Sequence, residues 1–178
     1  MNRAMPRPDI HIAVDDPDSW PRAPRELEEL GQTIRGAISA ALAVAEWPEH
    51  MPASVTPEIS VTLSGDERVR QLNREWRGKD RPTNILSFPA PSGMPLPAGE
   101  PRPLGDLVLA GPVVRAEARA AGVPLAEHLA WLVIHGMLHL LGYDHQTDRE
   151  RAVMEELERR ALKHLDYPCP HGGAGEAA

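Results

Sequence analysis

The segment HGMLHLLGYDH, residues 135–145, places three histidines at a spacing that suits a metal ion. His135 and His139 are four residues apart, so on a helix they lie on one face, about one turn from each other. Gly142 follows where a helix end favours the left-handed conformation that glycine adopts without steric cost. The chain can then turn back and bring His145 toward the other two. We therefore predict one metal ion per chain, bound by His135, His139 and His145.

The chemistry of three imidazole ligands favours Zn²⁺, with Ni²⁺ and Cu²⁺ as alternatives on grounds of affinity. Three protein ligands leave a position open on zinc, where water can lose a proton near neutral pH. The H-x-x-x-H-x-x-G-x-x-H spacing is that of the metzincin proteases, but Gly136 stands where a zinc protease carries its glutamate base. The segment predicts a hydrolytic metal site without the usual base of a peptidase.

Other residues near this motif have two interpretations each. A single histidine on a buried helix is more often a hydrogen-bonded core residue than a ligand, and we predict this for His128, which lies outside the motif. Asp144 either orients an imidazole or helps to handle a proton, or it caps the turn. Asp106, in LGDLVL at 104–109, is either a hydrogen-bond partner of a metal-bound histidine or a hydrogen-bonding residue at a strand end.

A second candidate site is the segment RVRQLNREWRGKDR, residues 68–81, which holds six basic and two acidic side chains. The whole chain has a net charge of −7, but a phosphate backbone is bound by a local patch rather than by the sum of charges. We predict phosphate contacts from Arg68, Arg70, Arg74 and Lys79. The alternative is a solvated helix face and loop with ordinary salt bridges.

Hydrophobic periodicity predicts the elements that position these groups. Alternation with period two and β-branched residues predict strands at 9–14, 58–65, 84–90 and 104–111. Apolar residues every three to four positions predict helices at 25–46, 66–77, 112–122, 124–141 and 148–165. The helix at 124–141 is apolar nearly all round, so it should be buried at the centre of the molecule. In the helix at 66–77, Val69, Leu72 and Trp76 form one apolar face.

The mixed order of strands and helices predicts an α+β fold with a mixed sheet of about four strands packed against helices. We predict one metal-dependent hydrolase domain over residues 1–166 and a flexible tail over 167–178. The segment 91–103 is rich in proline and glycine and should hold no regular structure. Thr147 and Glu150 predict a capping box for the last helix, whose role we interpret as architectural, with Met154 in the core.

Length and composition limit the class of protein. A chain of 178 residues fits one domain, and its single cysteine, Cys169, excludes an intramolecular disulfide and favours a reducing compartment. The N-terminus lacks the apolar run of a signal peptide, and the longest apolar stretch, LAWLVIHGMLHLLG, is too short to span a bilayer. We predict a cytoplasmic protein with no membrane partner.

Three strings of the sequence resemble the YbeY family of bacterial RNA maturation endoribonucleases: HGMLHLLGYDH, RGKDRPTNILSFP at 77–89 and LGDLVL at 104–109. The resemblance covers roughly residues 58–165 and implies an α+β fold with zinc held by the three motif histidines. It implies a single-strand-specific endoribonuclease in ribosomal RNA maturation and ribosome quality control, with rRNA precursors and ribosomal components as partners. The functionally important arginine of the family falls on Arg77. The segment 91–103 and the extended tail depart from the family pattern.

The chemistry of Arg77 agrees with this resemblance. A guanidinium binds phosphate through two nitrogens and stabilises charge on phosphoryl oxygens, although Arg77 could also be an ordinary surface arginine. A peptidase needs a proton shuttle for its amine leaving group, and Gly136 removes the usual one. We predict a zinc-dependent endoribonuclease. The alternatives are a non-catalytic ribosome-assembly factor with a structural metal and a metalloprotease-like hydrolase.

Overall fold

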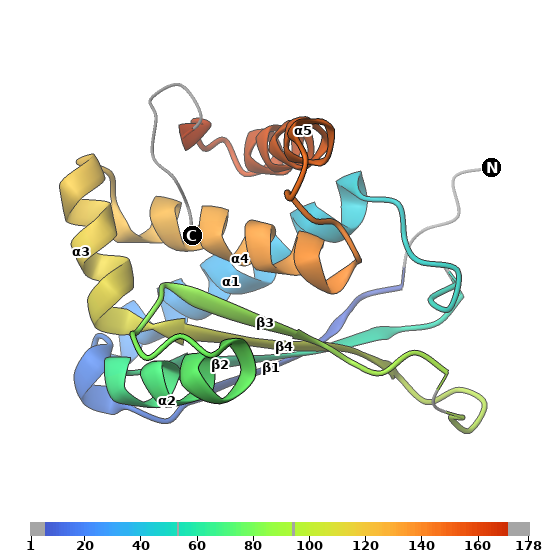
Figure 1. The fold of residues 1–178 in the computed structure, drawn as a ribbon, viewed down its shortest axis with the longest axis horizontal. Coiled ribbons are helices and arrows are strands. Elements are labelled where there is room, and N and C mark those ends of the chain that lie inside the picture. The colour runs from blue at the N-terminus through green and yellow to red at the C-terminus, as the bar shows by residue number, and fades with distance from the viewer. Residues whose placement is uncertain (1–5, 53, 94, 171–178) are drawn as a thin grey trace.

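The computed structural model describes residues 6–52, 54–93 and 95–170, and it contains one four-stranded mixed sheet with helices on both faces (Figure 1). In chain order the elements are β1 (Asp9–Val14), the 3-10 turn η1 (Pro17–Ser19), α1 (Pro24–Val44), β2 (Pro57–Ser64), α2 (Asp66–Arg77), β3 (Ile85–Pro89), β4 (Arg102–Ala110), α3 (Gly111–Ala121), α4 (Leu125–Leu140) and α5 (Asp148–His164). The predicted α+β single-domain fold is confirmed.

The strand order in the sheet is β1-β2-β4-β3. β1 pairs with β2 and β2 with β4 in parallel, whereas β3 pairs with β4 in the antiparallel sense. β3 is therefore an edge strand. It pairs with β4 in a register that sets Ile85 opposite Leu109 and Phe88 opposite Asp106. This edge adjoins the candidate site described below.

The helices form unequal layers on the two faces of the sheet. α1 and α4 cover one face, α5 packs over them on the side away from the sheet, and α2 lies on the opposite face (Figure 1). Every residue of α4 from Leu129 to Leu138 is buried, because the sheet, α1, α3 and α5 all pack against this helix. The prediction of a buried central helix carrying the motif histidines is confirmed.

A smaller apolar cluster joins α2 to the other face of the sheet, and it consists of Val69, Leu86, Val108 and Ala110. Val69 is fully buried there, as its place on the apolar face of α2 predicts. Trp76 is not, since 71% of it is exposed to solvent. The predicted apolar face is therefore buried at Val69 but open at the last turn of the helix.

The structure corrects the prediction for the proline-rich segment. Residues 102 and 103 belong to β4 rather than to the loop, because they pair with Pro57 and Glu58 of β2 and the Arg102 N–H donates to the Thr56 carbonyl at 2.9 Å. Of the predicted tail, residues 171–178 lie outside the described part of the chain. Tyr167 packs against the main core, half-buried.

Within the described ranges, no single helix is both apolar enough and long enough to cross a membrane. By length and composition alone, α3 and α4 pass that criterion as a pair bent by 116°.

Candidate metal centre and adjoining cleft

The three motif histidines come together where α4 ends. α4 carries His135 and His139 on consecutive turns, and Gly142, with a φ of 95°, reverses the chain so that His145 returns toward them. The ring centroids are 4.7 Å apart for His135 and His139, 5.1 Å for His139 and His145, and 5.5 Å for His135 and His145. One nitrogen from each ring lies within 4.8 Å of the other two. The three side chains therefore converge as the spacing predicts.

Hydrogen bonds fix which nitrogens point into this cluster. The Nδ1 of His135 lies 2.7 Å from Glu158 Oε1, and the Nδ1 of His139 lies 3.0 Å from the Tyr143 carbonyl oxygen. A carbonyl and a carboxylate accept hydrogen bonds, so each Nδ1 carries a proton, and in a neutral ring the Nε2 then has a lone pair. These two Nε2 atoms are 3.1 Å apart. With a lone pair on each, they cannot hydrogen-bond to each other, and such a donor set fits a cation.

Burial keeps His139 in the form that binds metal. Desolvation, together with the neighbouring imidazoles of His135 and His145, lowers the pKa of His139 to about 4. His139 is therefore neutral at physiological pH. Neutral imidazole is the form that coordinates metal ions.

Glu158 on α5 is a residue of this site that the sequence analysis assigned to architecture. Its side chain is 2% exposed, and it accepts hydrogen bonds from His135 and from the Trp131 Nε1 at 3.0 Å. A carboxylate behind a metal-bound histidine fixes the ring and raises its basicity. The available sequence signal was an acidic residue on the face of α5 that also carries Met154 and Ala161, both buried.

Replacing Glu158 with glutamine tests this role. Glutamine has one acceptor oxygen, so it cannot serve both Trp131 and His135 as the carboxylate does. We expect metal affinity to fall about 10- to 100-fold, measured by competition with a chromophoric chelator. Glu156→Gln is the matched control, because Glu156 lies on the same helix and pairs with Arg159 at the surface. Equal affinities of the two variants would show that Glu158 does not act on the metal.

The structure also explains why glycine stands at position 136. A Cβ added there would come within 2.8 Å of the Ile85 Cδ1 and Leu107 Cδ2 atoms, and 3.1 Å of the Ser87 Oγ. Position 136 therefore faces side chains of β3 and β4. A glutamate at this position would require the Ile85 and Leu107 side chains to shift, so glycine fits this packing better than the base of a zinc protease.

The histidine cluster opens into a cleft of about 1110 Å³ that extends along the β3 edge to α2. Among the predicted site residues, the cleft brings together Arg68, Arg77, Asp106, Asp144, His135, His139 and His145. Arg70, Arg74 and Lys79 lie outside its lining. The cleft thus joins the possible metal ligands to two of the predicted phosphate-binding cations.

Comparison with known proteins gives matches over most of the chain. The family model "Endoribonuclease YbeY" matches residues 22–166. The chain belongs to the YbeY family. A protein named Endoribonuclease YbeY from Zymomonas mobilis is 41% identical over 91% of this chain and 93% of its own. Another of that name, from Azorhizobium caulinodans, is 44% identical over 92% of this chain and 96% of its own. The solution structure of TM1509 from Thermotoga maritima is 20% identical in sequence to this chain. The two align over 95% of this chain and 99% of TM1509, with a TM-score of 0.46.

Two residues next to the YbeY motif histidines have local partners. Asp144 accepts hydrogen bonds from the His145 N–H and the Gln146 Nε2, both at 2.8 Å, which is the turn-capping alternative for this residue. His128 lies 2.8 Å from the Glu117 Oε2 through its Nε2, away from the cluster. Asp106 is an exposed residue of β4 and lines the cleft.

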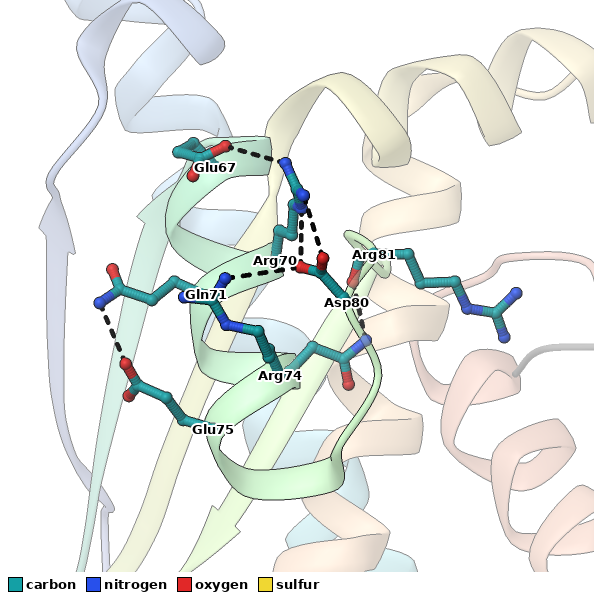
Figure 2. A network of polar contacts seen from close by, with 8 residues as sticks. Glu67, Arg70, Gln71, Arg74, Glu75, Asp80 and Arg81 are labelled. Carbon is teal, nitrogen blue, oxygen red and sulfur yellow. Dashed lines mark hydrogen bonds and ion pairs between the residues drawn. The ribbon is translucent and has the colours of Figure 1, made fainter.

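The basic segment of this YbeY chain is partly tied to an acidic side chain, as Figure 2 shows. Asp80, in the loop after α2, accepts hydrogen bonds from Arg70 at 2.9 and 3.1 Å, and Arg74 lies 3.8 Å from it. The hydrogen bond with Arg70 lowers the pKa of Asp80 and raises that of Arg70. Arg70 and Arg74 therefore hold the loop against α2, and Arg68 and Lys79 are the predicted phosphate contacts outside this network.

Proposed function

We propose that this chain is a zinc-dependent endoribonuclease that cleaves single-stranded RNA in the cytoplasm, during ribosomal RNA maturation and ribosome quality control. The observation that supports this most is the convergence of three histidine nitrogens at one end of a cleft that Arg77 also lines. The relatives named Endoribonuclease YbeY support the choice of RNA as substrate.

The proposed roles follow from the contacts of each side chain. His135, His139 and His145 would hold the ion, and Glu158 would orient His135. When bound, zinc supplies Lewis-acid chemistry, polarising a phosphoryl oxygen and making water more acidic. Arg77 would bind the scissile phosphate through its planar guanidinium and stabilise the charge that develops on the phosphoryl oxygens. Asp106, in the same cleft, is a candidate to handle a proton.

The two alternative functions are disfavoured by specific features. A metalloprotease needs a carboxylate beside the histidines, and position 136 faces the sheet. A purely structural metal site is usually closed by four protein ligands. Here three candidate ligands lie together, and all three line an open cleft.

The proposal is tested by comparing cleavage of a single-stranded RNA with cleavage of a duplex RNA. We expect purified protein to cut a single-stranded RNA and to leave the same sequence intact as a perfect duplex, because duplexed bases and backbone do not fit a site that binds an extended strand. His145→Ala, purified identically, measures contaminating nuclease. Equal cleavage by both preparations would overturn the proposal, as would equal cleavage of both substrates.

The basic segment gives a separate prediction about affinity. If Arg68 and Lys79 contact phosphates, replacing both with glutamine should flatten the slope of log affinity against log salt by about 1.4, from roughly 0.7 per phosphate of a single strand. Arg25→Gln on α1 is the control, because Arg25 is exposed and pairs with Glu29 away from the cleft. An unchanged slope in the double variant would show that Arg68 and Lys79 do not contact phosphates and belong to an ordinary solvated surface.

A further inference from the structure

We propose that Trp76 is a stacking surface for one unpaired base of the RNA, placed beside the phosphate that Arg77 binds. This rests on the proposed RNA substrate and adds to it a specific contact to a base. No chemical step is assigned to Trp76, which we infer to be a positioning and specificity residue.

The first observation is the exposure of a large aromatic side chain. Trp76 is 71% exposed, whereas Trp20 and Trp131 are 3% and 7% exposed. Among the described residues, the only other large hydrophobic side chain with comparable exposure is Val153, at 46%. Exposing an indole to water forgoes the favourable burial of its apolar surface. A single exposed apolar residue does not by itself indicate a partner, so the inference depends on where this indole lies.

The second observation is the position of this indole. Arg68, Leu72 and Trp76 recur every four residues on α2, and all three line the cleft that leads to the histidine cluster. Arg77 follows directly in the chain and lines the same cleft. The indole therefore lies on the cleft wall between groups suited to phosphates, which favours RNA over a protein as the molecule that covers it.

The third observation is that the indole has support from behind. The ring of Phe88 on β3 packs against Trp76 in an edge-to-face arrangement, with the centroids 5.9 Å apart and the planes at 67°. Such aromatic pairs have a preferred geometry and restrict the orientation of both rings. The edge strand thus holds the indole while most of its surface remains open to solvent.

The chemistry of stacking gives this surface a selectivity. A base in a single strand can leave its neighbours and present its face to an aromatic ring, whereas a base in a duplex is already stacked on both sides. Stacking tolerates any base, because every base has a π-face. Trp76 would therefore contribute to a preference for single strands without selecting a sequence.

The test is a cycle of protein and RNA changes, measured by binding. The RNA is a single strand with 2′-O-methyl groups, which cannot be cut through its own hydroxyl, and one abasic position is moved along it. We expect Trp76→Leu to bind the intact RNA about tenfold more weakly, as for loss of one stacked base, and Trp76→Phe to retain most of the affinity. Removing the base at one position of the RNA should weaken the binding of wild type about tenfold. The same abasic RNA should bind to Trp76→Leu with nearly the affinity that this variant has for the intact RNA.

Two controls separate stacking from damage to the fold. Unfolding curves and metal content should be unchanged in Trp76→Leu, since Trp76 lies at the surface and outside the histidine cluster. Val153→Ala, which shortens an exposed apolar side chain on α5, should bind RNA like wild type.

The outcomes distinguish this inference from the proposed nuclease activity. Additive losses at every abasic position, or full affinity of Trp76→Leu, would overturn stacking while leaving cleavage intact. Loss of affinity for a protein of the ribosome in Trp76→Leu, with RNA binding unchanged, would make the indole a protein-docking residue instead. Base-dependent binding through Trp76, with no cleavage of the unmodified single strand by wild type, would support stacking and overturn the nuclease. Failure of wild type to bind the RNA at all would overturn both.

Discussion

Replacing His139 with alanine is expected to remove most of the bound metal and to reduce RNA cleavage by roughly a thousandfold, since a metal ion supplies several kcal/mol of transition-state stabilisation. The two remaining histidines cannot hold the ion with the affinity of three. The fold should survive, because His139 is only half-buried and lies in the last turn of α4. Metal analysis of the gel-filtered protein, with circular dichroism on the same sample, measures both effects.

His11→Ala provides a demanding control for this experiment. The imidazole of His11 lies with the carboxylates of Asp9 and Glu58 in a second group whose ligand atoms fall within 4.8 Å of one another. If the ion sits in the cleft, His11→Ala should keep its metal and its activity. The account would be contradicted if His139→Ala kept its metal and His11→Ala lost it.

The second large effect is expected for Arg77→Lys. Lysine keeps one positive charge but loses the planar fork that binds two phosphoryl oxygens. If this interaction strengthens as charge develops, the cleavage rate should fall about 10²- to 10³-fold while RNA affinity falls less than about threefold. Single-turnover cleavage and equilibrium binding on one preparation separate the two quantities, and metal content should be unchanged.

Arg81→Lys is the matched control for Arg77→Lys. Arg81 is a neighbouring exposed arginine that does not line the cleft, and its side chain extends away from the Asp80 network in Figure 2. It should cleave RNA at the wild-type rate. Equal losses of rate and affinity in Arg77→Lys would make Arg77 a docking residue, and no loss in either would remove it from the active site.

Local pattern was sufficient to predict most of the fold. The predicted bounds of β1 and α2 agree with the structure to the residue. The hydrophobic periods of two for a strand and 3.6 for a helix depend only on near neighbours in the sequence. The capping box of Thr147 and Glu150 is likewise local, and it is confirmed. The convergence of the three histidines follows from one helical turn and one left-handed glycine. The spacing of these residues in the sequence was therefore sufficient to predict this part of the site.

The features that the sequence did not reveal depend on contacts between distant segments. Glu158 reaches His135 across the packing of α5 on α4, 23 residues away in the chain. Asp80 folds back onto α2 through a loop, so two of the basic side chains have a partner that their own helix does not supply. The helical period places Trp76 on the apolar face of α2, which predicts burial. In the structure Trp76 lines the cleft instead and is 71% exposed.

The most direct test of a catalytic metal at the three histidines is to measure metal content and ribonuclease activity on one purified sample, before chelation, after chelation and after zinc is restored. We predict about one zinc ion per chain with cleavage of single-stranded RNA, loss of both after chelation, and recovery of both with zinc in wild type but not in His139→Ala. Full cleavage by protein shown to contain no metal would contradict the account.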